Sequence, residues 1–233
     1  MRFALIGRPN CGKSTLFNQV AGYRAQTGNF HGTTVSFLES RVRVAGEVID
    51  LVDLPGTYSL EASSPAEAEV SRYLASRDVD AIINVIDGSH PAQSLELTLE
   101  LLRLPRPVLV AVNMMDEAWK KGLHIKPAAL SRQLGIPVVP TVALMGQGIA
   151  KLFKTAVEAV RGKACPLPQP ASQHLCEKLQ PLSQALNRPE IQTAFSAWTT
   201  PHRVRAWVRA GLAGAFQTRR PDRVRARNSG GQI

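Results

Sequence analysis

The sequence lacks the features that mark secreted, membrane-spanning and metal-binding proteins. It has three cysteines and five histidines in 233 residues, and neither set shows the spacing of a metal site. So few cysteines, in an odd number, indicate a reducing compartment. No run of about 18 apolar residues is present, so no transmembrane helix is predicted. An apolar strand begins at residue 2, and we therefore expect no secretory signal before it.

The net charge of +10 is concentrated at one end of the chain. Residues 201–233 hold eight arginines and one aspartate, which leaves +3 for residues 1–200. Nucleic-acid-binding proteins carry basic residues on the folded surface that meets the phosphates. Because the excess lies in the tail, we expect no nucleic-acid partner. We interpret the tail as a solvated terminus, and contact with anionic lipid headgroups as the alternative.

The most informative segment is 7–14, which matches the phosphate-binding pattern G-x-x-x-x-G-K-[ST]. It lies between an apolar strand candidate, Phe3–Ile6, and a helix candidate over 13–21, which is the context that this motif requires. Glycines let the backbone wrap a phosphate chain, and the helix N-terminus adds its positive dipole end. The Lys13 ammonium is expected on the β- and γ-phosphates, and the Ser14 hydroxyl on Mg²⁺. The predicted phosphate contacts are Gly7, Arg8, Pro9, Asn10, Cys11, Gly12, Lys13, Ser14 and Thr15.

Cys11 lies inside this loop. One interpretation is a reactive thiol, because a helix N-terminus lowers a thiol pKa. The interpretation that we favour is a small residue tolerated at a variable position of the motif.

A second phosphate element follows about 40 residues later. Asp53-Leu54-Pro55-Gly56 comes directly after an apolar strand candidate. An aspartate at the end of a strand beside a phosphate-binding loop can hold Mg²⁺, and the amide of Gly56 can approach a γ-phosphate.

A third element concerns the base. Asn113-Met114-Met115-Asp116 follows the apolar run that ends at Val112. A carboxylate can accept hydrogen bonds from two neighbouring donors of guanine, a pair that adenine lacks. We therefore expect Asp116 to select guanine, while Asn113 braces the base and the phosphate-binding loop beside Met114. A backbone amide in Thr141-Val142-Ala143 is expected to cap the guanine carbonyl oxygen.

The glycine-containing stretch from Thr27 to Val35 is the expected switch loop. The hydroxyl of Thr33 or Thr34 can join Mg²⁺ when a γ-phosphate is present, and the loop relaxes after hydrolysis. A flexible surface loop is the simpler interpretation, and the two are compatible. His31, in the same stretch, is interpreted as a solvated histidine rather than a base or ligand.

Apolar strand candidates alternate with helix candidates, which predicts an α/β fold with a mostly parallel sheet. We expect six strands, one pair of them antiparallel, with flanking helices and a helical extension. The predicted domains are 1–165 for nucleotide binding, 166–218 for the helical extension and 219–233 for a disordered tail, with a proline-rich boundary at 166–170. The strands are expected at 3–6, 35–44, 48–52, 81–86, 107–112 and 137–139, and the helices at 13–21, 66–76, 92–103, 127–134 and 148–161.

The order of these motifs resembles that of the Ras-like P-loop GTPases. The segment Gly7–Asn18 resembles that of the bacterial group that includes the Era-like and tRNA-modification GTPases. The segments similar to those of the ferrous iron transport protein B family are Gly28–Val35, Asp53–Leu60, Ser64-Pro65, Ile83–Asp87, Asn113–Ala118 and Leu134–Thr141. The resemblance covers about residues 2–160. It implies GTP and GDP as ligands with Mg²⁺, a membrane-embedded iron permease region as partner, and a place on the cytoplasmic face of the bacterial inner membrane.

The resemblance also implies residue roles. Thr34 would join Ser14 and Asp53 on Mg²⁺, and Asn10 would bind an activating K⁺ with the carbonyls of Gly28 and Phe30. A K⁺ there neutralises developing phosphate charge. The residues expected to contribute to catalysis are Asn10, Lys13, Thr34 and Gly56.

The sequence departs from the pattern at three places. Thr57 stands where many Ras-like enzymes have a water-orienting glutamine, a lack that the resembling family shares, so we expect slow hydrolysis. Val142 replaces a serine usual in the base-capping motif. Residues 166–233 do not clearly match the family's helical regulatory domain. Two alternative functions remain: an RNA- or ribosome-associated Era-like GTPase, and a nucleotide-gated interaction module with negligible turnover.

We expect Val142 to loosen the base-capping loop and to speed nucleotide release. Val142→Ser should therefore slow GDP release several-fold in stopped-flow measurements. An unchanged release rate would rule this role out.

Overall fold

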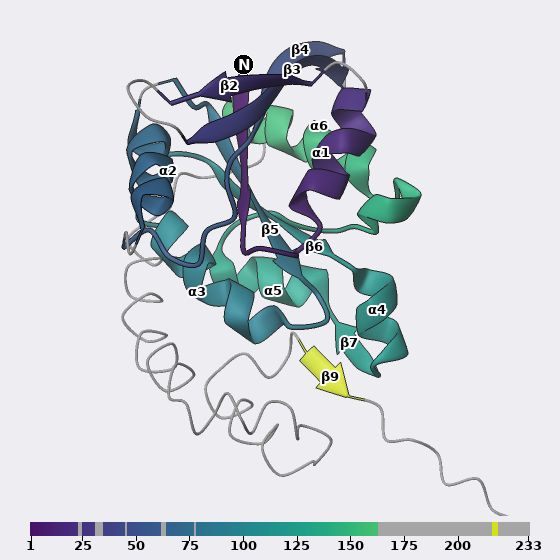
Figure 1. Ribbon diagram of the computed structural model, residues 1–233. Helices are drawn as coiled ribbons and strands as arrows, with labels where there is room; N and C mark the ends of the chain where they lie inside the picture. Colours follow the sequence, from purple (N-terminus) through teal and green to yellow (C-terminus); the bar gives the residue numbers. More distant parts are fainter. Residues whose placement is uncertain are drawn as a thin grey trace, which may run out of the picture.

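The computed structural model describes residues 1–22, 25–30, 35–44, 46–61, 64–76, 78–162 and 216–218. Its main feature is a seven-stranded sheet in the order β2-β3-β4-β1-β5-β6-β8, with helices on both faces (Figure 1). A separate two-stranded sheet pairs β7 with β9. The strands are β1 Arg2–Gly7, β2 Gln26–Asn29, β3 Ser36–Val44, β4 Glu47–Asp53, β5 Ala81–Asp87, β6 Val108–Asn113, β7 Leu123–Ile125, β8 Val138–Pro140 and β9 Phe216–Thr218. The helices are α1 Lys13–Ala21, α2 Pro65–Ala75, α3 Pro91–Leu101, α4 Met115–Lys120, α5 Pro127–Leu134, α6 Ile149–Val160 and the 3₁₀ turn η2 Ala143–Met145.

The expected α/β fold is confirmed, with one strand more than predicted in the main sheet. The seventh strand is β2, which forms in the stretch interpreted as a loop and pairs antiparallel with β3. Its residues, Gln26–Asn29, are polar and largely exposed, so no hydrophobic pattern marked them. The expected antiparallel pair is β3 with β4. In the rest of the main sheet, β4, β1, β5, β6 and β8 pair in parallel.

Helices α1, α2, α3, α5 and α6 lie within a few residues of their predicted positions. Ser64 caps α2, because its hydroxyl accepts a hydrogen bond from the Glu67 amide at 3.2 Å. Helix α4 was missed, since it is short and its N-cap is Met114 in a left-handed conformation rather than a serine or aspartate.

Most of the predicted helical extension over 166–218 and the whole tail over 219–233 lie outside the described residues, as does the boundary at 165. Within the extension, residues 216–218 form β9 rather than a helix. They pair antiparallel with β7, so a partner strand distant in sequence set their conformation.

Side chains that alternate along the central strands build two hydrophobic layers. On β1, Ala4 and Ile6 pack with α2, α3 and α5, whereas Phe3 and Leu5 pack with α1 and α6. All four side chains are fully buried. A strand that is covered on both faces has a continuous run of apolar residues, as Phe3–Ile6 has in this sequence.

The parallel strands place their carboxyl ends along one edge of the sheet. Leu5 on β1 pairs with Asp53 on β4, and Gly7 pairs with Val85 on β5. Loops that follow neighbouring parallel strands therefore meet there, as in other open α/β sheets. No described helix is both long and apolar enough to cross a bilayer.

The contribution of the α6 layer can be tested with two leucine substitutions. Leu152 is fully buried on α6, whereas Leu144 on η2 is 76% exposed. Leu152→Ala should lower the free energy of unfolding by about 2–5 kcal/mol, while Leu144→Ala should change it by about 0.5 kcal/mol or less. Urea unfolding monitored by circular dichroism measures both, and equal effects would contradict the described packing.

Candidate nucleotide-binding site

The segment between β1 and α1 borders a cavity of about 480 Å³. Gly12, at φ 82°, is the N-cap of α1, and Asn10 also adopts a left-handed backbone at φ 65°. Asparagine tolerates this conformation better than most residues. The cavity is lined by Arg8, Pro9, Asn10, Gly12, Lys13, Ser14, Thr15, Gly56 and Met114, all of them residues predicted from the motifs.

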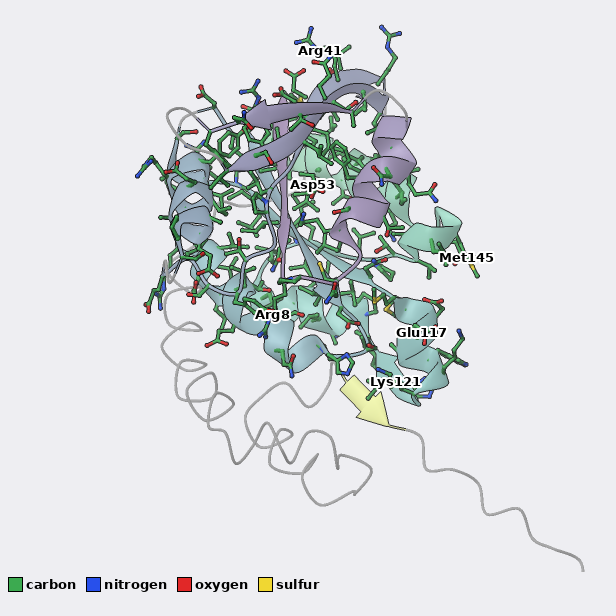
Figure 2. All side chains as sticks on the ribbon, viewed as in Figure 1. Arg8, Arg41, Asp53, Glu117, Lys121 and Met145 are labelled. Carbon is green, nitrogen blue, oxygen red and sulfur yellow. The ribbon has the colours of Figure 1, made fainter. Side chains whose placement is uncertain are left out.

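Lys13 and Ser14 meet Asp53 at the base of this site. The Lys13 ammonium forms an ion pair with Oδ1 of Asp53, and the Ser14 hydroxyl donates to Oδ2 at 2.9 Å. Lys13 and Asp53 are both less than a tenth exposed. Figure 2 shows Asp53 in the interior of the domain, between the sheet and α1. The first two predicted phosphate elements are therefore in direct contact.

Asn113 connects the third element to the first. Its Nδ2 donates to the carbonyl oxygen of Cys11 at 3.0 Å, while its Oδ1 accepts from the Ala143 amide at 2.9 Å and from the Thr141 hydroxyl at 3.3 Å. A Cβ on Gly12 would lie 2.3 Å from Asn113 Nδ2, so glycine is required there. The expected brace between Asn113 and the phosphate-binding loop is present, and it extends to the base-capping segment.

Asp116 lies in the first turn of α4, two residues beyond the cavity-lining Met114, and is partly buried. Val142 is buried, and its amide donates to the Gln147 carbonyl at 3.1 Å. The Met115 amide donates to the Thr141 carbonyl at 3.4 Å, so the first turn of α4, which holds Asp116, lies next to the segment around Val142 at the ends of β6 and β8.

The segment after Gly56 is held by three elements. The Thr57 amide donates to the Gly7 carbonyl at 3.0 Å, and the Tyr58 amide donates to Glu67 of α2 at 3.2 Å. The Ser59 hydroxyl and the Leu60 amide donate to Glu100 of α3. Sequence reasoning missed both glutamates, because each lies within a helix and is linked to this segment only by folding.

Two further features of this segment bear on chemistry. Burial raises the pKa of the Glu100 carboxyl above its ordinary value, against the hydrogen bonds from Leu60 and Ser59. Thr57 is fully buried, and its hydroxyl donates to the Pro55 carbonyl at 3.0 Å. The Thr57 side chain is therefore committed to the backbone rather than directed into the cavity.

The residues implied for K⁺ binding do not all border the cavity. Gly28 pairs with Phe37 in the β2–β3 ladder, and the ring of Phe30 packs against Phe37 and Tyr73 with centroids 4.9 and 5.6 Å away. Neither Gly28 nor Phe30 is among the described residues that line the cavity beside Asn10. His31, Thr33 and Thr34 lie outside the described residues. Within the described part of the chain, no cluster of three acidic, histidine or cysteine side chains suits a metal ion.

The fold and this site are those of a Ras-like P-loop GTPase domain. The sequence model of the family described as ferrous iron transport protein B matches residues 1–156, and the chain belongs to this family. The chain is 44% identical over 162 residues to the Fe(2+) transporter FeoB of Escherichia coli, covering 68% of this chain and 21% of that protein. It is 43% identical over 164 residues to a FeoA–FeoB fusion protein of Porphyromonas gingivalis, covering 70% and 19%.

A solved structure extends the similarity. The cytosolic domain of FeoB from T. maritima in a GMPPNP form superposes with a TM-score of 0.71 at 32% identity, and the match covers 93% of this chain and 99% of that one. The chain spans about a fifth of the length of the curated relatives above.

The structure overturns the reactive-thiol interpretation of Cys11. The side chain is 1% exposed, and burial raises its pKa to about 11, against the lowering effect of the Lys13 amide and charge. Desolvation of the thiolate therefore outweighs the helix N-terminus.

Cys11 should resist alkylation in the native protein. At pH 8 a thiol with a pKa of about 11 is ionised in about one molecule in a thousand, against roughly one in four for an ordinary thiol. Iodoacetamide labelling followed by peptide mass spectrometry should show slow reaction at pH 8 and a rate that rises with pH. Urea-unfolded protein is the control and should react at the ordinary rate; fast labelling of the native protein would contradict the assignment.

Proposed function

We propose that the chain binds and hydrolyses GTP as a switch that regulates or drives ferrous iron uptake. The observation that carries the proposal is the contact of Lys13 and Ser14 with Asp53 under a cavity bordered by the phosphate-binding loop. The GMPPNP form of the T. maritima relative supports a guanine nucleotide as the ligand.

Lys13 binds the β- and γ-phosphates, and the backbone amides of the loop surround them. Asp53 and Ser14 offer the oxygen donors that Mg²⁺ prefers, and Thr34 would be the third residue to hold the ion. When bound, the ion neutralises charge on the phosphates. The ion pair with Asp53 keeps Lys13 at the floor of the cavity.

Guanine is selected by Asp116, with Asn113 and Met114 beside it. The hydrogen bonds that join Asn113 to Cys11, Thr141 and Ala143 fix the base-binding side of the site to its phosphate-binding side. Val142 lies in the segment that caps the base.

Hydrolysis proceeds without a side-chain base after Gly56, because the Thr57 hydroxyl is bound to the Pro55 carbonyl. Backbone groups position water, and the amide of Gly56 approaches the γ-phosphate. A Cβ at Gly56 would lie 3.0–3.2 Å from Pro9, so glycine allows the close approach of these two segments. Intrinsic turnover is therefore slow. Asn10 would hold K⁺ with the carbonyls of Gly28 and Phe30, and the ion would supply positive charge against the charge that develops on the phosphates.

In the cell, this domain acts on the cytoplasmic face of the inner membrane with a membrane-embedded iron permease region of the same protein or of a partner. The relatives named above are Fe²⁺ transporters, and this chain matches about a fifth of their length. An RNA- or ribosome-associated GTPase is not favoured, because the chain belongs to the iron transport family.

Potassium dependence tests the role of Asn10. GTP hydrolysis should be faster in K⁺ than in Na⁺, and the stimulation should be lost in Asn10→Ala and Asn10→Gly. The glycine variant removes the side chain without straining the left-handed backbone at this position.

Asn18→Ala, an exposed asparagine on α1, is the matched control and should keep the stimulation. Stimulation that survives in both Asn10 variants would remove the K⁺ assignment. Absence of turnover in every salt would instead favour a nucleotide-gated interaction module.

A further inference from the structure

The Arg8 side chain connects the phosphate-binding loop to two other elements. Its guanidinium carbon lies 4.8 Å from the ring centroid of Tyr58, and Nη1 donates a hydrogen bond to the Gln93 carbonyl in the first turn of α3. Arg8 also borders the nucleotide cavity. Figure 2 places Arg8 at the carboxyl edge of the sheet beside α3, at the opposite end of the domain from Arg41.

The contact with Tyr58 is made by a partly desolvated cation. Burial lowers the pKa of the Arg8 guanidinium, and the negative charge of Glu96 on α3 opposes this effect. Arginine stays ionised at neutral pH nonetheless. A cation over a tyrosine face is worth more when it is partly withdrawn from water, because water competes less for the charge.

Tyr58 directly follows Gly56-Thr57, so it is tied through one residue to the Gly56 amide that is proposed above to approach the γ-phosphate. The backbone of this segment is fixed on both sides, by the Gly7 carbonyl at Thr57 and by the Glu67 carboxylate at Tyr58. The Tyr58 side chain is 54% exposed, so packing of the hydrophobic core does not hold its ring. Arg8 is the cation that lies over this ring.

We propose that Arg8 is a positioning residue for GTP hydrolysis: through the Tyr58 ring, it holds the Gly56–Tyr58 segment against the phosphate-binding loop. This rests on the GTPase function proposed above and adds to it a residue whose side chain acts on the loop rather than on the phosphates. Lysine does not replace it, because only the planar guanidinium stacks on the ring while donating to Gln93.

The test compares Arg8→Ala, Arg8→Lys, Tyr58→Phe and Tyr58→Leu in the full chain. Tyr58→Phe keeps the aromatic face, whereas Tyr58→Leu removes it. Loss of the contact should lower kcat about five- to tenfold in Arg8→Ala and Tyr58→Leu, given the usual size of cation–π energies. KM for GTP and the affinity for GDP should stay close to those of the wild type. Tyr58→Phe should retain most of the turnover, and Arg8→Lys should not.

A double-mutant cycle adds a second criterion. Arg8→Ala with Tyr58→Leu should lower kcat no more than either single change, because both remove the same contact. Arg41→Ala is the matched control: Arg41 is an exposed arginine paired with Asp50 on the far side of the domain, and its loss should leave kcat unchanged.

Amide hydrogen exchange gives a readout that is independent of turnover. In the nucleotide-free protein, residues 57–60 should exchange faster in Arg8→Ala than in the wild type or Arg41→Ala. Unchanged exchange and unchanged kcat would overturn the proposal, as would additive effects in the cycle or a loss of GDP affinity that matches the loss of kcat. A wild type that exchanges as expected but hydrolyses no GTP would refute the proposed GTPase function instead.

Discussion

The buried contact of Lys13 and Ser14 with Asp53 is the interaction on which the rest of the site depends. It joins the first turn of α1 to the end of β4, across 40 residues of chain for Lys13 and 39 for Ser14. Strands β1 and β4 are neighbours in the sheet. A buried ion pair gains little net stability, because desolvation of both charges offsets their attraction. The pair is better understood as holding Lys13, which lines the cavity, beside the carboxylate at the end of β4.

Around that contact, hydrogen bonds connect each loop to a different structural element. Asn113 holds the carbonyl of Cys11 from the end of β6, and the backbone of Thr57 is bonded to Gly7. Glu67 and Glu100 hold the next residues from α2 and α3. These hydrogen bonds connect the segment after Gly56 directly to α2 and α3. A shift of that segment would therefore change its hydrogen bonds to both helices.

Much of the fold and of the site was predictable from the sequence. The apolar runs of β1, β5 and β6 identify strands buried on both faces, and the motifs name the residues that line the cavity. The polar strand β2 and the short helix α4 were not predicted, because pairing with β3 and a left-handed cap at Met114 determine them rather than local propensity. The alternative that Cys11 is a reactive thiol, which we did not favour from the sequence, is wrong, because the side chain is buried in one hydrophobic cluster with residues of β1 and α1 and burial raises its pKa.

The sequence by itself determined the order of the motifs, and with it the class of domain and the chemistry of its ligand. Short motifs carry this information because each one needs particular side chains at fixed spacing along a single loop. Only the tertiary structure decided which distant groups meet: Glu100 with Ser59, Asn113 with Cys11, and Arg8 with the ring of Tyr58. The physical reason is that these contacts depend on the order of parallel strands in the sheet, which brings together loops that are far apart in the chain.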